Sequence, residues 1–409
     1  MIANEILDYC FEKFVERNKK ESKSKNIDLD LLSCIQKYKY SLPKGFIYEY
    51  PINVFLKITS ACNLRCKHCF FSDIPEKYNP NNDFNFSDII NLLDFLINDL
   101  NIMSILLTGG EPFLNNDILK IIKYIKSYYV PLTIQTNGVL LSNNIVKELA
   151  QSIYSKTDLM QVSLDGVDPN THDFIRGSGT FEKAVDSIKL LREFNIPVQI
   201  NFTLTSTNAD NAINIFDLCR ELDVHKLSSN RFNVCNDKHK YLELSEEQVF
   251  KTNYMFYKEI QNYPDIFIKL KTLDFFDFVN NCYGRKLLDN YLTKVIKNNT
   301  IVNKCLSCHN HNKFTIAANG DIFFCSADES NDAILGNLRE HNFYDIWANR
   351  FNSPYFQVRD LTTTKCKNCK YITICNTGCM ASAYKKYGDI NCAPAECSYF
   401  EEYLKEQHG

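Results

Sequence analysis

Six apolar, strand-like runs alternate with helical patterns over residues 53–262 of this 409-residue chain. The runs fall near 53–59, 102–108, 131–136, 158–164, 197–204 and 224–230. The helical patterns fall near 87–99, 116–128, 144–154, 180–194, 208–221 and 245–262. Such alternation is typical of parallel strands with helices outside them, and six units are fewer than the eight of a closed barrel. The sequence therefore predicts an α/β fold, with a partial (β/α)6 barrel over residues 50–262.

The clearest helical pattern begins at Ser87, a residue type that often caps the first turn of a helix. Apolar residues then recur at the spacing of one helical face, at Ile89, Leu92, Leu93, Leu96, Ile97 and Leu100. We therefore expect an amphipathic helix that is capped by Ser87.

Cysteine-containing and polar segments follow four of the predicted strands, at the point where each strand ends. Cys62, Cys66 and Cys69 follow the first run, and Gly109-Gly110-Glu111-Pro112 follows the second. Thr136-Asn137-Gly138 follows the third run, and Ser163-Leu164-Asp165-Gly166 closes the fourth. The chemistry of such barrels lies at the carboxyl ends of the strands. We therefore expect the four segments to surround one cavity.

The composition excludes several classes of protein. The net charge of −3 gives no basic footprint for nucleic acid, and no stretch is apolar enough to span a bilayer. Met1–Phe14 lacks a basic region followed by an apolar core, so we expect no signal peptide and a cytoplasmic location. Since cytosolic thiols stay reduced, the 17 cysteines favour metal or cluster ligation over disulfides.

Cys62, Cys66 and Cys69 lie on one short segment, the cysteine loop (residues 62–69). Three thiolates can hold three irons of a four-iron cluster, and the fourth iron then has no ligand from this loop. Such an open iron can bind a small molecule and pass it an electron. A zinc site with His68 as the fourth ligand is the alternative, but it does not explain the Gly-Gly-Glu-Pro segment one strand later.

The cysteine loop and Gly109-Gly110-Glu111-Pro112 together resemble the radical S-adenosylmethionine (SAM) family, over residues 50–262. The resemblance implies a [4Fe–4S] cluster on the three cysteines and a loop from Gly109 to Pro112 that binds the methionine part of SAM. Reductive cleavage of SAM would give a 5′-deoxyadenosyl radical that abstracts hydrogen from carbon. Glu111 is expected to accept from the SAM ammonium group, and the two glycines to let the backbone approach SAM closely. Further SAM contacts implied by the resemblance are Asn137, Ser163 and Arg176.

The C-terminal part is dense in cysteine. Phe314–Ala318 and Asp321–Cys325 flank Asn319-Gly320, which predicts a β-hairpin. This hairpin and the later run Cys366-x2-Cys369-x5-Cys375-x3-Cys379 resemble the SPASM extension of radical SAM enzymes, which usually binds two further [4Fe–4S] clusters. The expected organisation is short helices and a linker at 1–49, the barrel at 50–262, a connecting segment at 263–304 and the cysteine-rich SPASM domain at 305–409.

The resemblance to SPASM proteins implies interleaved ligands for two auxiliary clusters. The cluster nearer the barrel would be held by Cys305, Cys308, Cys325 and Cys379, and the outer cluster by Cys366, Cys369, Cys375 and Cys397. Cys392 competes with Cys397 for the last position. If Cys305 or Cys308 is not a ligand, the inner cluster has an open iron that can take a substrate thiolate. Two interleaved zinc sites are the alternative that the spacing alone allows.

Enzymes with both modules often modify peptides or proteins. The resemblance therefore implies a maturase that crosslinks or oxidises a side chain of a ribosomally made peptide or protein, with ferredoxin or flavodoxin as electron donor. Sulfatase maturation is less favoured, because Ser326 stands where those enzymes carry an acidic base; modification of a tetrapyrrole or another cofactor stays open. An alternative of another class is a non-catalytic iron–sulfur electron-transfer or sensing protein, against which Glu111 and the glycine pair argue. No catalytic acid or base can be assigned.

Overall fold

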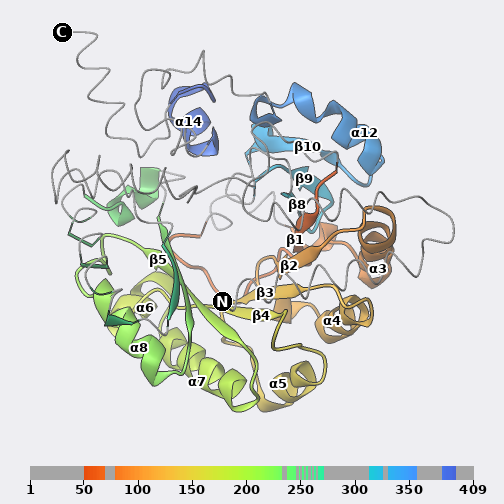
Figure 1. The fold of residues 1–409 in the computed structure, drawn as a ribbon. Helices are drawn as coiled ribbons and strands as arrows, with labels where there is room; N and C mark the ends of the chain where they lie inside the picture. The colour runs from red at the N-terminus through yellow and green to blue at the C-terminus, as the bar shows by residue number, and fades with distance from the viewer. Residues whose placement is uncertain are drawn as a thin grey trace, which may run out of the picture.

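The computed structural model describes residues 50–69, 79–232, 237–245, 266–270, 313–325, 330–356 and 380–392, together with single residues between 248 and 263. Figure 1 shows a curved sheet with helices along its outer side. The short strands and helices of the C-terminal part lie at one end of this arrangement, next to β1.

One ten-stranded sheet runs through the described residues, in the order β10-β9-β8-β1-β2-β3-β4-β5-β6-β7. The strands are β1 (Asn53–Lys57), β2 (Ser104–Thr108), β3 (Leu132–Thr136), β4 (Leu159–Ser163), β5 (Val198–Leu204), β6 (Lys226–Arg231), β7 (Phe267–Leu270), β8 (Lys313–Ile316), β9 (Asp321–Phe323) and β10 (Ile334–Asn337). All neighbouring pairs from β1 to β7 are parallel. The predicted α/β partial barrel is confirmed, and each of the six predicted runs contains a strand.

Helices follow the strands in the predicted alternation. They are α3 (Phe86–Asp94), α4 (Ile118–Ser127), α5 (Asn143–Ala150), α6 (Pro169–Arg176), α7 (Thr180–Glu193), α8 (Ile215–Glu221), α12 (Phe343–Ala348) and α14 (Met380–Tyr387). A π-helical turn, η3 (Phe95–Asp99), extends α3, and the 3-10 turns are η2 (Pro80–Asn82), η4 (Pro112–Leu114), η5 (Ala212–Asn214), η6 (Asp237–Leu242), η8 (Asn331–Ala333), η9 (Asn349–Asn352) and η10 (Pro354–Phe356). Within the predicted helix at 245–262, residues 248, 251–252, 255–256 and 259 are described and helical. None of the helices described has the length and apolar character needed to cross a membrane.

Helix α3 is capped by Asn85, so the prediction of Ser87 as its cap is wrong. The Asn85 side chain accepts a 3.0 Å hydrogen bond from the Asp88 backbone N–H. The Asp88 carboxylate in turn accepts one of 3.1 Å from the Asn85 N–H. This reciprocal pair satisfies two N–H groups near the start of the helix, whereas a serine cap satisfies one.

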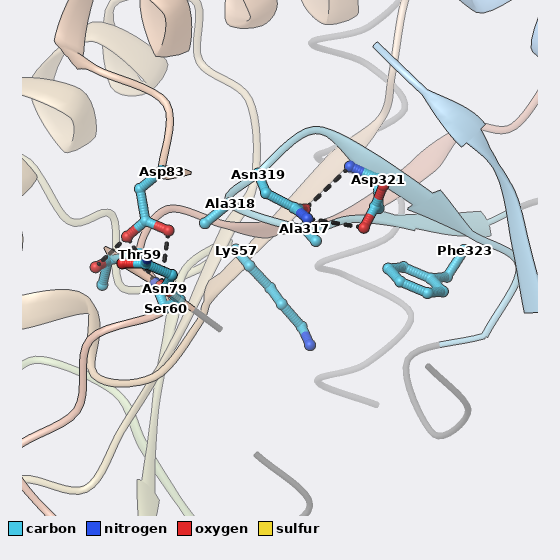
Figure 2. Close-up of a pocket in the computed structure, with 10 residues that line it drawn as sticks. All are labelled: Lys57, Thr59, Ser60, Asn79, Asp83, Ala317, Ala318, Asn319, Asp321 and Phe323. Atoms are coloured by element: carbon cyan, nitrogen blue, oxygen red, sulfur yellow. Dashed lines mark hydrogen bonds between the residues drawn. The ribbon is translucent and has the colours of Figure 1, made fainter. Parts of the chain in front are cut away.

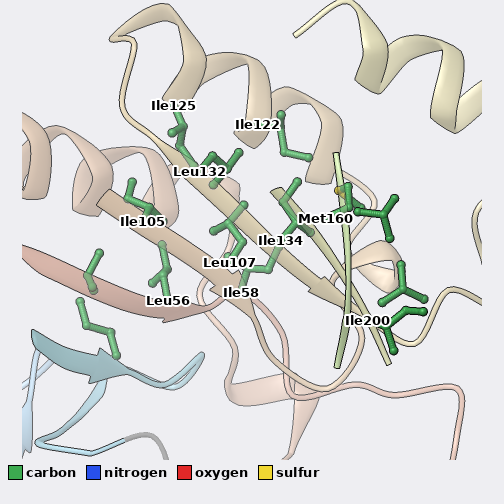
Figure 3. Packing of buried hydrophobic residues seen from close by; sticks show 14 of the residues in the cluster. Leu56, Ile58, Ile105, Leu107, Ile122, Ile125, Leu132, Ile134, Met160 and Ile200 are labelled. Atoms are coloured by element: carbon green, nitrogen blue, oxygen red, sulfur yellow. The ribbon is translucent and has the colours of Figure 1, made fainter. Parts of the chain in front are cut away.

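The strands of the barrel place alternate residues on opposite faces. Ile134, Met160 and Ile200 point outward and pack with helix residues such as Ile122 and Ile125 in one buried cluster (Figure 3). Because side chains alternate along a strand, the residues between them point to the inner face. On β3, β4 and β5 these inner residues include Gln135, Gln161, Ser163 and Asn201. The inner face of these strands is therefore polar, while the core lies between the sheet and the helices.

The sheet extends beyond the six predicted strands at both ends. Strand β7, which pairs with β6, lies after residue 262, where the sequence predicted the barrel to end. At the other edge, β8 pairs in parallel with β1 and in antiparallel with β9. This confirms the predicted hairpin, whose turn contains Gly320 at φ +96°, and joins it directly to the barrel sheet.

Candidate active site

One cavity brings the four strand-end segments together. It encloses about 740 Å³, counting the space at its open mouth. Its lining consists of Cys62, Leu64, Cys66, His68, Cys69, Thr108, Gly109, Gly110, Glu111, Gln135, Thr136, Asn137, Ser163, Arg176 and Asn201. Of the predicted SAM contacts in the barrel, Pro112 is absent from this lining; it is buried in the first turn of η4.

The cysteine loop follows β1 and turns back on itself through a 3.0 Å hydrogen bond from the Cys69 N–H to the Cys66 carbonyl. The Lys67 N–H donates to the Ile175 carbonyl of α6 at 2.8 Å, which fixes the loop against that helix. Burial raises the pKa of Cys66 to about 11, an effect that the guanidinium of Arg176 partly opposes. Burial also raises the pKa of Cys62. Iron binds thiolates and displaces their protons, so three thiols on one short loop fit a site that iron completes.

A single zinc ion fits the loop less well. Among the residues that the structure describes, no three Cys, His, Asp or Glu side chains converge on the position of one metal ion. His68, the fourth ligand in the zinc alternative, places its Nε2 2.9 Å from the Asp165 carboxylate. The donor set therefore suits a larger cluster that spreads its ligands over the loop.

The two glycines of the Gly-Gly-Glu-Pro segment make room for the residues that precede Cys62. A Cβ on Gly109 would lie 2.3 Å from the Thr59 carbonyl oxygen, and one on Gly110 would lie 2.1 Å from that of Ala61. The Gly110 N–H donates to Thr59 O and the Glu111 N–H to Ala61 O, both at 2.8 Å. The sequence predicted that the glycines serve the approach of SAM; in the structure their nearest neighbour is the start of the cysteine loop.

Glu111 is 1% exposed and links two strand ends. Its carboxylate accepts from Thr136 Oγ1 at 2.7 Å, from the Asn137 N–H at 2.8 Å and from the Phe113 N–H at 3.3 Å. Burial raises the pKa of Glu111, and these hydrogen bonds oppose the shift. A carboxylate offers about four lone-pair positions, so one remains for an ammonium group in the cavity.

The remaining predicted SAM contacts differ in how many of their hydrogen-bonding groups already have a partner in the protein. Asn137 donates from Nδ2 to Asn63 Oδ1 at 2.8 Å and accepts from the Val139 N–H at 2.9 Å, so it supports the cysteine loop. Arg176 donates from Nε to Asp165 at 2.5 Å. Within the described part of the chain, Ser163 Oγ and the two terminal nitrogens of Arg176 make no hydrogen bond, and both residues line the cavity.

A second, smaller pocket lies where β1 meets the β8–β9 hairpin (Figure 2) and encloses about 330 Å³. At its edge the Asp83 carboxylate accepts from Thr59 Oγ1 at 2.9 Å and from the N–H and Oγ of Ser60, both at 2.8 Å. The next residue, Phe84, donates its N–H to the Ala318 carbonyl of the hairpin at 2.7 Å. Residues 83–84 thus tie the hairpin to the segment that enters the cysteine loop.

Two of the C-terminal candidate ligands are described. Cys325 is buried just after β9, and Cys392 is buried with its Sγ 3.7 Å from the Asp389 carboxylate. The predictions for the other candidates stay predictions, because these residues lie outside the described residues: Cys305, Cys308, Cys366, Cys369, Cys375, Cys379 and Cys397.

Gln135 and Asn201 line the cavity without having been singled out in the sequence. Both are amide residues that alternate with large apolar residues along their strands, and this alternation was the available signal in the sequence. The Gln135 Nε2 donates to Gln161 Oε1 at 2.6 Å, and the Asn230 Nδ2 donates to Asn201 Oδ1 at 2.9 Å. Side-chain amides therefore form hydrogen-bonded pairs across neighbouring strands on the inner face.

Two family models match this chain. The model of the radical SAM superfamily matches residues 56–219, and that of SPASM, an iron–sulfur cluster-binding domain, matches residues 299–370. An AdoMet-dependent heme synthase of Methanosarcina barkeri is 26% identical over 350 residues, covering 84% of this chain and 95% of the relative. A cysteine-type anaerobic sulfatase-maturating enzyme of Clostridium perfringens is 23% identical over 349 residues, covering 80% and 89%.

Among solved structures, Streptococcus suis SuiB bound to S-adenosylmethionine has a TM-score of 0.65 at 20% identity, covering 94% of this chain and 87% of SuiB. At that identity the likeness shows the fold. The two matched domains imply a SAM-binding [4Fe–4S] cluster, SAM itself and auxiliary clusters. The curated relatives are enzymes, which leaves the non-catalytic alternative without support. This chain is a radical SAM enzyme with a C-terminal SPASM domain.

Proposed function

We propose that this enzyme modifies a side chain of a ribosomally made peptide or a protein, by crosslinking or oxidation. The observation that carries the proposal is a wall of two amide pairs, Gln135–Gln161 and Asn201–Asn230. One member of each pair, Gln135 and Asn201, lines the SAM cavity. Primary amides both donate and accept hydrogen bonds, as the backbone of an extended peptide does. This wall therefore offers partners to a peptide that enters the barrel.

The same wall is a poor surface for a tetrapyrrole, which presents a wide apolar face and several carboxylates. Among the residues that line the cavity in the described part, Leu64 is the one large aliphatic side chain. Arg176 is the one arginine or lysine there, and it is already bonded to Asp165. The amide wall thus favours a substrate that exchanges hydrogen bonds with it.

Within the cavity, we assign the cluster to Cys62, Cys66 and Cys69. Glu111 has one acceptor position left for the SAM ammonium group, and Ser163 and Arg176 have donors for its carboxylate. Gly109, Gly110, Pro112 and Asn137 are the further proposed SAM contacts, and the two glycines and Asn137 also pack against or bond to the segment around the cysteine loop. When bound, the reduced cluster and SAM supply a carbon-centred radical that abstracts hydrogen from the substrate.

The remaining roles follow from the resemblance to SPASM proteins. The two auxiliary clusters are bound by the interleaved cysteines given in the sequence analysis. A ferredoxin or flavodoxin supplies the electrons, and the enzyme acts in the cytoplasm. SuiB has also been crystallised with its precursor peptide SuiA, which supports a peptide partner for a protein of this fold.

A tetrapyrrole is the second candidate substrate, because the heme synthase of Methanosarcina barkeri matches this chain over most of both lengths. Sulfatase maturation has the support of the Clostridium perfringens relative. It is less favoured, because Ser326 cannot accept a proton as a carboxylate does.

Isotope transfer tests the substrate class. The anaerobically reconstituted enzyme is incubated with SAM, a reductant and either deuterated small peptides from cells that express the chain or a deuterated tetrapyrrole. We expect deuterium in 5′-deoxyadenosine with the peptides, together with a peptide that has lost two hydrogens or gained a carbonyl. Deuterium transfer from the tetrapyrrole but not from the peptides would overturn the proposal.

A further inference from the structure

Asp165 joins three separate segments around the cavity. It follows β4, and its side chain is completely buried. Its carboxylate lies 2.9 Å from His68 Nε2 of the cysteine loop and 2.5 Å from Arg176 Nε of α6. It also accepts the Thr203 N–H of β5 at 2.7 Å. One carboxylate thus contacts the cysteine loop, the arginine assigned to SAM and the neighbouring strand.

The backbone of Asp165 is held as firmly as its side chain. Its N–H donates to His172 Nδ1 at 3.1 Å, and its carbonyl accepts from Asn208 Nδ2 at 2.8 Å. Because its backbone and its carboxylate both have partners, the position of this carboxylate is fixed before any ligand binds.

The charges around Asp165 favour its ionised form. The guanidinium of Arg176 and the ring of His68 outweigh the effect of burial and hold the pKa of Asp165 well below its usual range. Burial and the Arg176 charge lower the pKa of His172 to about 4, so that its neutral ring can accept the Asp165 N–H. A buried charge of this kind is stable only with its partners in place. A movement of Arg176 therefore changes the interaction of the shared carboxylate with His68, and a movement of His68 changes its interaction with Arg176.

We propose that Asp165 is a positioning residue that couples the cysteine loop to Arg176, and so sets the geometry in which the cluster and SAM meet. Its bond to Arg176 Nε orients the guanidinium, with the two terminal nitrogens left for the SAM carboxylate. Its bond to His68 holds the loop between Cys66 and Cys69. The proposal rests on the cofactor roles assigned above and does not depend on the substrate class.

Asp165→Asn is the direct test, with Asp158→Asn as its matched control. Asp158 lies at the other end of β4, is equally buried and is paired with Lys126 at 2.7 Å. Each reconstituted variant is titrated with SAM while the paramagnetic signal of the reduced cluster is recorded. Mutation of a residue that orients the ligands of a metal site typically lowers metal affinity or activity about 10- to 100-fold. We therefore expect Asp165→Asn to need at least about 10-fold more SAM for the spectral change, and Asp158→Asn to need the wild-type amount at a lower melting temperature.

An Asp165→Asn protein that still assembles its cluster and responds to wild-type SAM concentrations would overturn the proposal. So would an equal loss of SAM response in Asp158→Asn, because the effect would then reflect general destabilisation.

A double-mutant cycle covers the case in which Asp165→Asn does not fold. His68→Phe and Arg176→Lys each alter one partner of the carboxylate and leave Asp165 in place. If Asp165 couples them, their effects on the SAM concentration at half-saturation are non-additive by about 3-fold or more; additive effects would disprove the coupling. Both experiments use SAM alone, so a failed substrate assignment leaves their outcome unchanged.

Discussion

Strand β4 carries a buried carboxylate at each end, and the two have different uses. At its amino end, Asp158 accepts from Lys126 Nζ at 2.7 Å, the Leu132 N–H at 2.9 Å and the Tyr154 N–H at 2.7 Å. Lys126 Nζ also donates to a backbone carbonyl, that of Val130, at 2.9 Å. This cluster joins β4 to α4 and β3 and does not line the cavity.

At the carboxyl end, Asp165 has the same kind of partners, a cation and a backbone N–H, but its cationic partner also faces the cavity. Arg176 uses one nitrogen for Asp165 and lines the cavity with the rest of its guanidinium. The ion pair at the amino end of β4 therefore contacts only protein groups, whereas the cation of the pair at the carboxyl end can also bind a ligand in the cavity. In barrels of this type the carboxyl end carries the chemistry and the amino end contributes stability.

The largest effect is expected from Cys66→Ala, which removes one proposed cluster ligand at the carboxyl end. Formation of 5′-deoxyadenosine from SAM, measured by chromatography, should disappear, while iron bound by the auxiliary clusters remains. Cys219→Ala is the control, because Cys219 is also buried but lies in α8 and does not line the cavity. SAM cleavage by Cys66→Ala at the wild-type rate would remove the basis of the site assignment.

Lys126→Met should reveal the role of the amino end. It leaves the buried Asp158 charge without its cation, which costs about 3–5 kcal/mol of unfolding free energy. We expect a large fall in the denaturation midpoint, and an unchanged SAM concentration for the spectral response at a temperature where the variant is folded. A parallel loss of SAM affinity would mean that the two ends of β4 are not separate in function.

Gly110→Ala should disturb the carboxyl end by steric overlap. The new Cβ would lie 2.1 Å from the Ala61 carbonyl oxygen, so the entry to the cysteine loop must shift. Overpacking of this kind costs about 1–3 kcal/mol, and we expect weaker SAM binding as well, measured by the same titration.

Gly179→Ala is the matched control for Gly110→Ala. Gly179 has a positive φ of +73°, but no atom lies within 4 Å of the place that its Cβ would take, so it tests backbone strain without overlap. It should cost about 1–2 kcal/mol of stability, because an L side chain is strained in the left-handed conformation, and leave SAM binding intact. Equal effects of the two alanines on SAM binding would contradict the loop-packing account.

The regular part of the fold was predictable because its signals are local. Alternating apolar runs located all six strands, and Asn319-Gly320 located the hairpin. Helix α6 was missed because Phe174 and Ile175 are its only large apolar residues, which is too few to show a helical period, although Asp168-Pro169 at its start and Gly177 at its end are ordinary helix boundaries. Strand β7 was missed because it is four residues long and lies in a region without a clear period.

The sequence predicted which segments surround the cavity, but it did not predict the contacts and roles of the individual residues. The rule about strand ends brought together the cysteine loop, Glu111 and Ser163. The packing role of Gly110 depends on a carbonyl of Ala61, and the role of Asp165 depends on His68, Arg176 and Thr203. Such contacts join residues far apart in the chain, and a single sequence carries no record of them.

A gradual effect is expected from pH, through the buried imidazole of His172, which contacts the carboxyl end of β4. Its folded pKa of about 4 lies below the value near 6.5 of an unfolded histidine. Between these values the unfolded chain binds more protons, so the unfolding free energy rises with pH, by at most about 1.4 kcal/mol per pH unit, and levels off above about pH 6.5. His172→Gln, whose amide oxygen can still accept the Asp165 N–H, should flatten this slope in denaturation curves recorded from pH 4.5 to pH 7. If the unfolding free energy of the variant still rises with pH, the titrating group is not His172. A neutral His172 ring would then not be a difference between the two ends of β4.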